Sequence, residues 1–141
     1  MNQAPLASSI VALGLLPVAV LYVHTFASGF RKTAAHRVTG VLAVSGDLVL
    51  SIFYMLFRTL GGQVQGSTFH PTGMVFAFFV FHGSIALIVI LLELWIIVSA
   101  INYHRTKTMF AHHRWLSKLT FVLWFVTFLS GEGVYITSYL R

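Results

Sequence analysis

Four long apolar segments, joined by short polar connections, constrain the fold of this chain more than any other feature. They span about residues 5–29, 37–60, 73–102 and 115–139. A helix needs roughly 20 apolar residues to cross the hydrocarbon core of a bilayer, so each segment is long enough. Only 9% of the 141 residues are charged, and no polar stretch is long enough to form a soluble domain. The sequence therefore predicts a single all-α transmembrane domain over residues 1–141.

Basic residues predict the orientation of these segments. Seven of the nine Lys and Arg residues lie in or beside the first and third connections. Because basic loops stay on the cytoplasmic side, both termini and the Gly-rich connection at 60–73 are expected outside. The first segment has no Lys or Arg ahead of it and is long for a signal peptide, so we expect it to be retained as the first span. Short connections favour antiparallel neighbours, which predicts an integral membrane up-and-down four-helix bundle, N-out and C-out.

The composition excludes several classes of site. The chain has no cysteine, which excludes disulfides, thiolate metal sites and iron–sulfur clusters. It also lacks a nucleotide-binding loop, a nucleophile elbow and an HExxH motif. The net charge of +6 comes from the segment ends, where topology signals occur, and does not indicate a nucleic-acid partner. The histidines and the three acidic residues remain as the candidates for chemistry.

Polar residues recur at steps of 11 along the second and third segments. The second segment carries His36, Asp47 and Arg58, and the third carries His82, Glu93 and His104. Eleven residues make about three helical turns, so each set lies on one face of its helix. A charged group in the hydrocarbon core costs about 2.5 kcal/mol or more. Both faces are therefore expected to point into the bundle.

Asp47 and Glu93 form the first candidate site. Counted from the cytoplasmic ends of their segments, the two carboxyl groups lie at a similar depth, and Tyr54 lies on the same face as Asp47. If the carboxyl groups are close, at least one should be protonated, because like charges repel strongly in a low dielectric. They could form part of a proton path between His36 and His82, or they could only hold two helices in register. The sequence leaves both interpretations open.

A second polar layer is expected in the outer third of the bundle. It would contain His82, Tyr54 and Glu132, and Tyr135 and His70 could join it. His82, Glu132 and His70 supply the nitrogen and oxygen ligands that suit zinc or copper(II). The alternative is a hydrogen-bonded cluster of Glu, His and Tyr side chains that fixes helix packing.

Five of the seven histidines gather at the predicted cytoplasmic face. They are His24, His36, His104, His112 and His113, and every segment contributes. Two imidazoles from facing helices could hold a b-type haem, because imidazole is a common ligand of iron. His36 and His113 form the best pair, since each begins a segment that runs outward, and His24 and His104 are further candidates. The alternative is that these side chains mark the interface and bind lipid phosphate.

Three stretches of the sequence resemble a known family. They are AAHRVTGVLAVSGDLVLSIFY (34–54), FHG inside the third segment, and HHRWLSKLTFVLWFVTFLSGEGVY (112–135). The pattern resembles the small four-helix membrane proteins typified by CtaM, which are associated with making functional haem–copper oxidases in bacteria and have relatives in archaea. The resemblance implies a multi-pass protein of the plasma membrane of a bacterium or archaeon. Glu132 departs from the pattern, because a small or apolar residue is expected between Gly131 and Gly133.

Together these observations predict an accessory or assembly protein of a respiratory-type metalloenzyme complex, not itself an enzyme. It would handle haem b or a copper or zinc ion through its His and acid clusters. Its Phe-rich faces would contact lipid and a larger membrane partner. One alternative is a b-type cytochrome with His36 and His113 as haem ligands. Another is a purely structural subunit of a larger membrane enzyme complex.

Overall fold

The computed structural model describes residues 6–31, 34–60, 72–108 and 110–139, without the side chains of residues 104, 138 and 139. These residues form four helices and no strand. The helices are α1 (Leu6–Phe30), α2 (Ala34–Thr59), α3 (Gly73–Thr106) and α4 (His113–Tyr139). All four are long and apolar enough to cross a membrane. The prediction of an all-α, multi-pass membrane protein is therefore confirmed.

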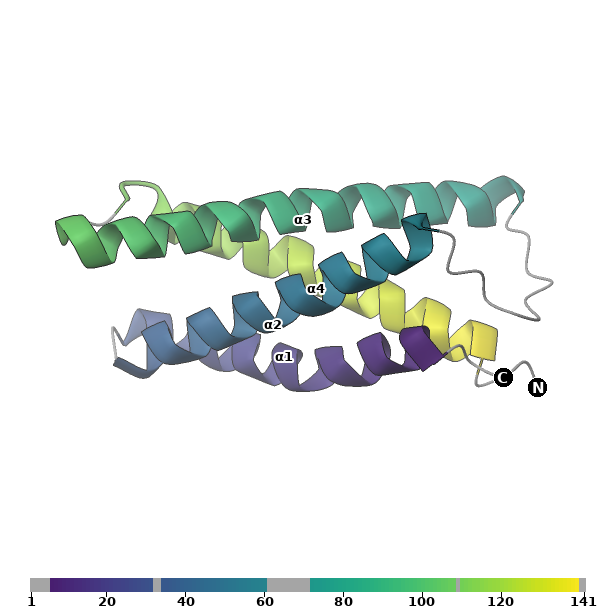
Figure 1. Ribbon diagram of the computed structural model, residues 1–141, viewed down its shortest axis with the longest axis horizontal. Helices are drawn as coiled ribbons and strands as arrows, with labels where there is room; N and C mark the ends of the chain where they lie inside the picture. The colour runs from purple at the N-terminus through teal and green to yellow at the C-terminus, as the bar shows by residue number, and fades with distance from the viewer. Residues whose placement is uncertain (1–5, 32–33, 61–71, 109, 140–141) are drawn as a thin grey trace.

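The helices run alternately in opposite directions, as the colours of Figure 1 show. We call the end at which α1 and α3 finish and α2 and α4 begin the basic end. At the opposite end, α2 and α4 finish and α1 and α3 begin. This is the up-and-down four-helix bundle that the short connections predict. The N-out and C-out orientation stays a prediction.

Three helix ends differ from those predicted by two residues or more, all at the basic end. α2 begins at Ala34 instead of residue 37, α3 continues to Thr106 instead of 102, and α4 begins at His113 instead of 115. Hydropathy marks where the apolar core stops, whereas the helices continue through the polar surface layer. α3 ends where Lys107 adopts a left-handed conformation (φ 58°) and its N–H bonds the carbonyl of Tyr103 at 2.8 Å.

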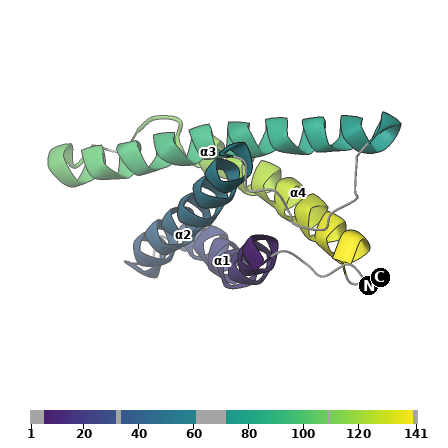
Figure 2. The same cartoon turned by 45° about the vertical axis from the view of Figure 1, so that its right-hand side comes forward.

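The bundle consists of two helix pairs. α1 packs closely along α2, α3 packs along α4, and α1 also contacts α4, whereas α2 and α3 make the least contact. Figure 2 shows α1 and α2 side by side, with α3 across the far side of the bundle. Small residues permit the tight first pair: a Cβ added at Gly46 would lie 3.1 Å from Val18, and one at Gly14 would lie 3.0 Å from Leu50.

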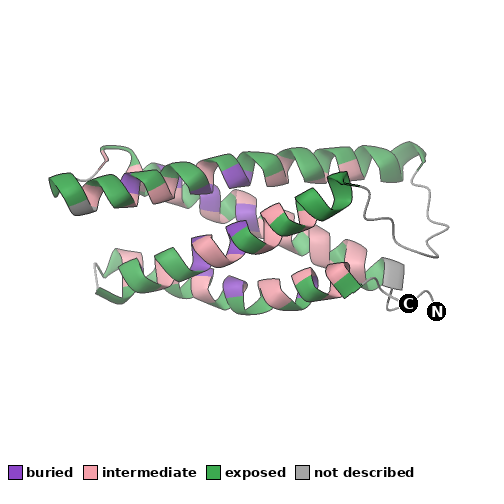
Figure 3. Ribbon diagram, in the orientation of Figure 1, coloured by how far each residue is buried: buried purple, intermediate pink, exposed green. Residues whose placement is uncertain are grey.

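The buried core occupies the middle of the bundle and contains polar as well as apolar side chains. Its apolar members are Val18, Tyr22, Ala43, Val44, Leu48, Val89, Ile90 and Trp124. Asp47, Glu93 and Thr120 are buried among them. Much of the ribbon in Figure 3 is green, which marks exposed residues, and many of the exposed side chains are large and apolar. Such a surface suits contact with lipid, which needs no polar partner.

Candidate functional site

The most deeply buried polar group of the bundle lies near the middle of all four helices. We call it the buried acidic centre: Tyr22 on α1, Asp47 and Ser51 on α2, Glu93 on α3, and Trp124 on α4. Glu93 is 0% exposed and Asp47 is 3% exposed. The two carboxyl groups lie close enough to interact with each other. The structure therefore brings Asp47 and Glu93 together, and the role of the pair stays a prediction.

Hydrogen-bond donors surround the two carboxyl groups unevenly. The Tyr22 hydroxyl donates to Glu93 Oε1, and the Ser51 hydroxyl donates to Asp47 Oδ2 at 3.3 Å. The Trp124 side chain also interacts with the Asp47 carboxyl group. In contrast, Glu93 Oε2 is buried and has no hydrogen-bond partner among the described residues. One of the four carboxyl oxygens is thus left as an unpaired acceptor.

Aromatic stacking holds the Tyr22 hydroxyl in position. The Tyr22 ring stacks on the Trp124 ring, with 4.4 Å between their centroids and 21° between their planes. Trp124 stacks in turn on Phe128, with a centroid separation of 5.1 Å. Stacked aromatic pairs of this kind are worth about 0.5–1.5 kcal/mol beyond the area they bury. The stack fixes Tyr22 from α1 against α4 while its hydroxyl reaches Glu93 on α3.

Tyr54 is not among the residues that contact the two carboxyl groups. Its hydroxyl bonds Ser8 Oγ at 3.3 Å, and it lies two turns along α2 from Asp47, about 10 Å away by helical rise. The tyrosine that reaches the carboxyl groups is Tyr22. Counted in residues from the basic end, Tyr22 on α1 and Trp124 on α4 lie at a depth similar to that of Asp47 and Glu93. This similarity in depth is a sequence signal that identifies them as neighbours of the two carboxyl groups.

A second candidate site lies at the basic end, where one side chain from the first turn of α2 approaches one from the first turn of α4. We call it the histidine pair: His36 and His113, whose ring centroids are 6.4 Å apart with planes at 78°. Both side chains are half-buried. His36 Nδ1 lies 2.9 Å from the Thr25 carbonyl oxygen. If Nδ1–H donates to this carbonyl, the tautomer is fixed and Nε2 is left free to bind a ligand.

Glycine at position 29 makes room for the His36 ring. A Cβ added at Gly29 would lie 3.1 Å from both Cε1 and Nδ1 of His36. The imidazole therefore packs directly against the backbone of α1. The ring is held on one side by this contact and at Nδ1 by the Thr25 carbonyl group.

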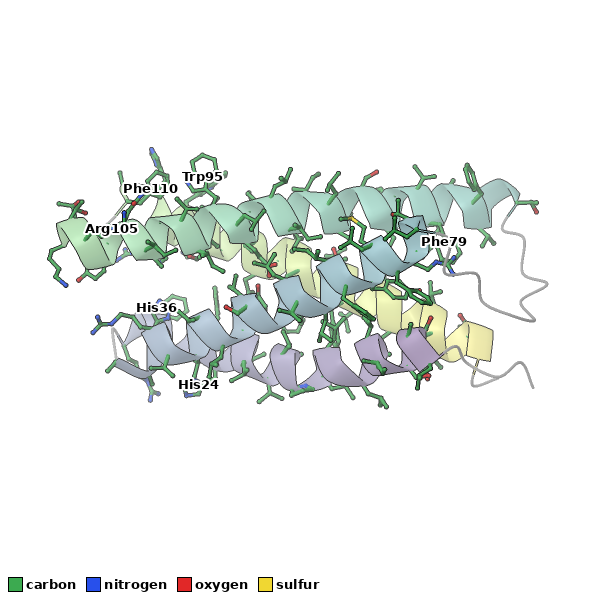
Figure 4. The ribbon with its side chains drawn as sticks, viewed as in Figure 1. His24, His36, Phe79, Trp95, Arg105 and Phe110 are labelled. Atoms are coloured by element: carbon green, nitrogen blue, oxygen red, sulfur yellow. The ribbon has the colours of Figure 1, made fainter. Side chains whose placement is uncertain are left out.

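Of the other predicted haem-binding histidines, His24 does not join this pair. His24 is exposed and its Nδ1 lies 3.3 Å from Thr39 Oγ1. Figure 4 shows His24 and His36 on opposite sides of the α1–α2 pair. His104 lies within α3, and its side chain is outside the described residues. A position near a helix end does not specify which way a side chain points, so the sequence does not predict the direction of His24.

The ring separation of the histidine pair is close to that of two imidazoles that bind one metal. Two imidazoles on opposite sides of one metal have centroids about 6 Å apart, given metal–nitrogen bonds of about 2.0–2.1 Å. The 6.4 Å separation of His36 and His113 agrees with this value. No group of three or more His, Cys, Asp or Glu side chains suited to a metal ion occurs within the described residues. Haem iron needs only two protein ligands, because the porphyrin supplies the others.

The outer polar layer is connected differently from the predicted metal site. His82 Nδ1 pairs with Ser130 Oγ at 2.8 Å, and its ring stacks near Phe78 with centroids 6.3 Å apart. Glu132 is half-buried two residues further along α4, and His70 lies outside the described residues. The His82–Ser130 bond joins α3 to α4, as a packing role requires. Metal binding by His82, Glu132 and His70 stays a prediction.

Serines of α1 bond the two tyrosines at the opposite end of the bundle. Ser8 pairs with Tyr54 on α2, and Ser9 Oγ lies 2.9 Å from the Tyr135 hydroxyl on α4. These bonds join α1 to both of its neighbours. The polar groups of this end are thus used largely in contacts between helices.

Comparisons of the chain with protein-family models, with curated proteins and with solved structures found no match.

Proposed function

We propose that this chain is an accessory membrane protein that holds an iron porphyrin between His36 and His113 for a larger respiratory-type metalloenzyme complex. The observation that carries the proposal is the 6.4 Å separation of two imidazole rings that come from different helices. The resemblance of the sequence to CtaM-like proteins supports the same assignment. A copper or zinc ion is a weaker candidate, because the described residues offer no third ligand at this place.

The residues around the pair support the roles assigned to its two members. The Thr25 carbonyl group and the Gly29 backbone position His36, and such supporting contacts commonly orient metal-ligating histidines. His113 is the first residue of α4, so its position depends on where that helix begins. Bound iron would supply a centre that changes oxidation state. The protein's own contribution is two fixed nitrogens at the end of an otherwise apolar bundle.

The apolar outer surface supports an accessory role within a membrane complex. Large side chains such as Phe76, Phe81 and Trp95 are more than half exposed. Contact with a larger membrane partner would take place across these lipid-facing surfaces.

Haem titration of the purified full-length protein tests the proposal. We expect wild-type protein in mild detergent to bind one haem and to show the absorption bands of a six-coordinate, bis-imidazole centre. His36→Ala and His113→Ala should each lose this spectrum. His24→Ala is the matched control and should keep it, because His24 lies on the other face. A wild-type protein that binds no haem, or a His113→Ala variant with an unchanged spectrum, contradicts the proposal.

The accessory role needs a separate measurement in the source cells. We expect deletion of the chain to lower the activity of a haem-containing oxidase complex, and His24→Ala but not His113→Ala to restore it. Rapid reduction of the bound haem by quinol would instead favour the electron-transferring b-type cytochrome. Co-purification at fixed stoichiometry without haem would favour a structural subunit.

A further inference from the structure

The buried acidic centre contains two carboxyl groups and no positive charge to balance them. Within the described residues, neither Asp47 nor Glu93 forms an ion pair with a Lys, Arg or His side chain. Both side chains are buried in the middle of the bundle. Two ionised carboxylates here would lose their hydration and repel each other. At least one of the two negative charges must therefore be neutralised.

The unpaired oxygen shows where the neutralising group is needed. Glu93 Oε1 accepts a hydrogen bond from Tyr22, whereas Oε2 has no partner among the described residues. A protonated carboxyl group is a donor, and an ionised one is an acceptor only. A proton on Oε2 would convert this atom from an unpaired acceptor into a donor, and the Asp47 carboxyl group lies within reach of Glu93. One proton thus removes both the unpaired atom and the repulsion.

We propose that the buried acidic centre is a proton-binding site within the membrane, in which Glu93 carries the proton on Oε2 and shares it with an ionised Asp47. The site is separate from the histidine pair, and this inference does not depend on haem binding. All four helices supply part of it, so the bound proton links the two helix pairs of the bundle.

The neighbouring donors assign the remaining negative charge to Asp47. Ser51 donates to Asp47, and the Trp124 side chain, whose indole N–H can only donate, also interacts with it. Glu93 receives one such donor, the Tyr22 hydroxyl group. Hydrogen bonds stabilise an ionised carboxylate more than a neutral one. The carboxyl group with more donors is therefore the better place for the charge.

A metal cation is a poorer occupant of this centre than a proton. A hard cation needs several oxygen ligands, commonly six or more for calcium and magnesium. The described residues contain no group of three His, Cys, Asp or Glu side chains that could hold a metal ion. The proton needs no more than the two carboxyl groups that are present.

Infrared spectroscopy of the full chain in lipid bilayers tests this proposal. A protonated carboxyl group has a C=O stretching band separate from that of an ionised carboxylate, and the band shifts in deuterium oxide. The chain has three acidic side chains, and the Glu132→Gln background leaves two of them. In that background we expect one protonated band in sodium-free buffer, which is lost in Glu93→Gln and kept in Asp47→Asn. Sodium should not change it.

Each alternative outcome overturns the assignment in a distinct way. Absence of the band from the Glu132→Gln background means that both carboxyl groups are ionised. A band kept in Glu93→Gln, or lost in Asp47→Asn, places the proton on Asp47. A band lost when sodium is added identifies a cation site. Should Glu93→Gln not fold, the Asp47→Asn spectrum alone decides which carboxyl group carries the proton.

Discussion

The buried acidic centre and the histidine pair are two polar sites in one apolar bundle, built in opposite ways. The centre lies at mid-length, takes side chains from all four helices, and includes a fully buried Glu93. The pair lies at the basic end, takes one ring each from α2 and α4, and is half-buried. In the centre, most polar groups have hydrogen-bond partners inside the bundle. In the pair, Nδ1 of His36 contacts the Thr25 carbonyl oxygen, and no hydrogen bond of Nε2 occurs within the described residues.

This difference separates what each site contributes. Side chains that bond each other inside the bundle hold the helices together, so replacing them should lower the free energy of unfolding. Side chains at the half-buried end of the bundle can bind a ligand, so replacing them should lower the affinity for that ligand.

Trp124→Ala should be the most damaging substitution. It removes the stack with Tyr22, the interaction with Asp47 and a nearly completely buried ring. We expect the free energy of unfolding to fall by about 3 kcal/mol, the lower end for loss of a large buried aromatic side chain. Circular dichroism during unfolding by a denaturing detergent measures this. Trp115→Ala is the matched control on α4, because Trp115 is 64% exposed. Equal losses for the two variants would contradict the role of Trp124.

Tyr22→Phe isolates the hydroxyl group from the ring. The stack with Trp124 stays, while Glu93 loses its donor. Loss of a buried hydrogen bond to a carboxyl group is worth about 2 kcal/mol. The same unfolding measurement checks this, with Tyr54→Phe as the control, because its bond to Ser8 is long at 3.3 Å. A Tyr22→Phe protein as stable as the wild type would show that the Glu93 contact is unimportant for folding.

Gly29→Ala should weaken haem binding more than it affects folding. The new methyl group would lie 3.1 Å from the His36 ring, so the ring must shift relative to the Thr25 carbonyl oxygen. Loss of such a supporting contact typically lowers metal affinity about tenfold or more. Haem titration measures the change in affinity. Gly83→Ala is the control, since nothing lies within 4 Å of its added Cβ. Unchanged affinity in Gly29→Ala would show that the ring position does not matter.

Ser51→Ala should have the smallest effect. Its hydroxyl donates to Asp47 across 3.3 Å, a long hydrogen bond. We expect a loss of about 0.5 kcal/mol in the free energy of unfolding. Ser84→Ala, where the hydroxyl bonds only its own helix at Val80, serves as the reference. A loss as large as that of Tyr22→Phe would mean that Asp47 depends on this donor more than its geometry suggests.

The fold could be predicted from hydropathy because lipid imposes a simple rule on length and composition. A helix of about 20 apolar residues is what a bilayer requires, and four such segments are present. The helix ends at the basic end could not be predicted as well. There α2 and α3 continue into polar surface residues, where hydropathy no longer distinguishes helix from loop.

The sites were predictable where a residue type is rare in lipid and not where it is common. The proximity of Asp47 and Glu93 could be predicted because a carboxyl group in a membrane bundle must point into the bundle interior. Tyr22 and Trp124 were missed because aromatic residues occur on lipid-facing and inward-facing surfaces alike. His36 and His113 were found by counting helix starts, whereas His24 needed the rotation of α1, which its nearly uniform apolar sequence does not reveal.

Electron paramagnetic resonance of ferric haem added to the full-length protein tests the separation of the two sites most directly. Two imidazole ligands give low-spin iron, and loss of one gives a high-spin signal or no binding. We expect a low-spin signal in the wild type and in Glu93→Gln, and its loss in His113→Ala. A low-spin signal that survives in His113→Ala but disappears in Glu93→Gln would contradict the assignment of haem binding to the histidine pair.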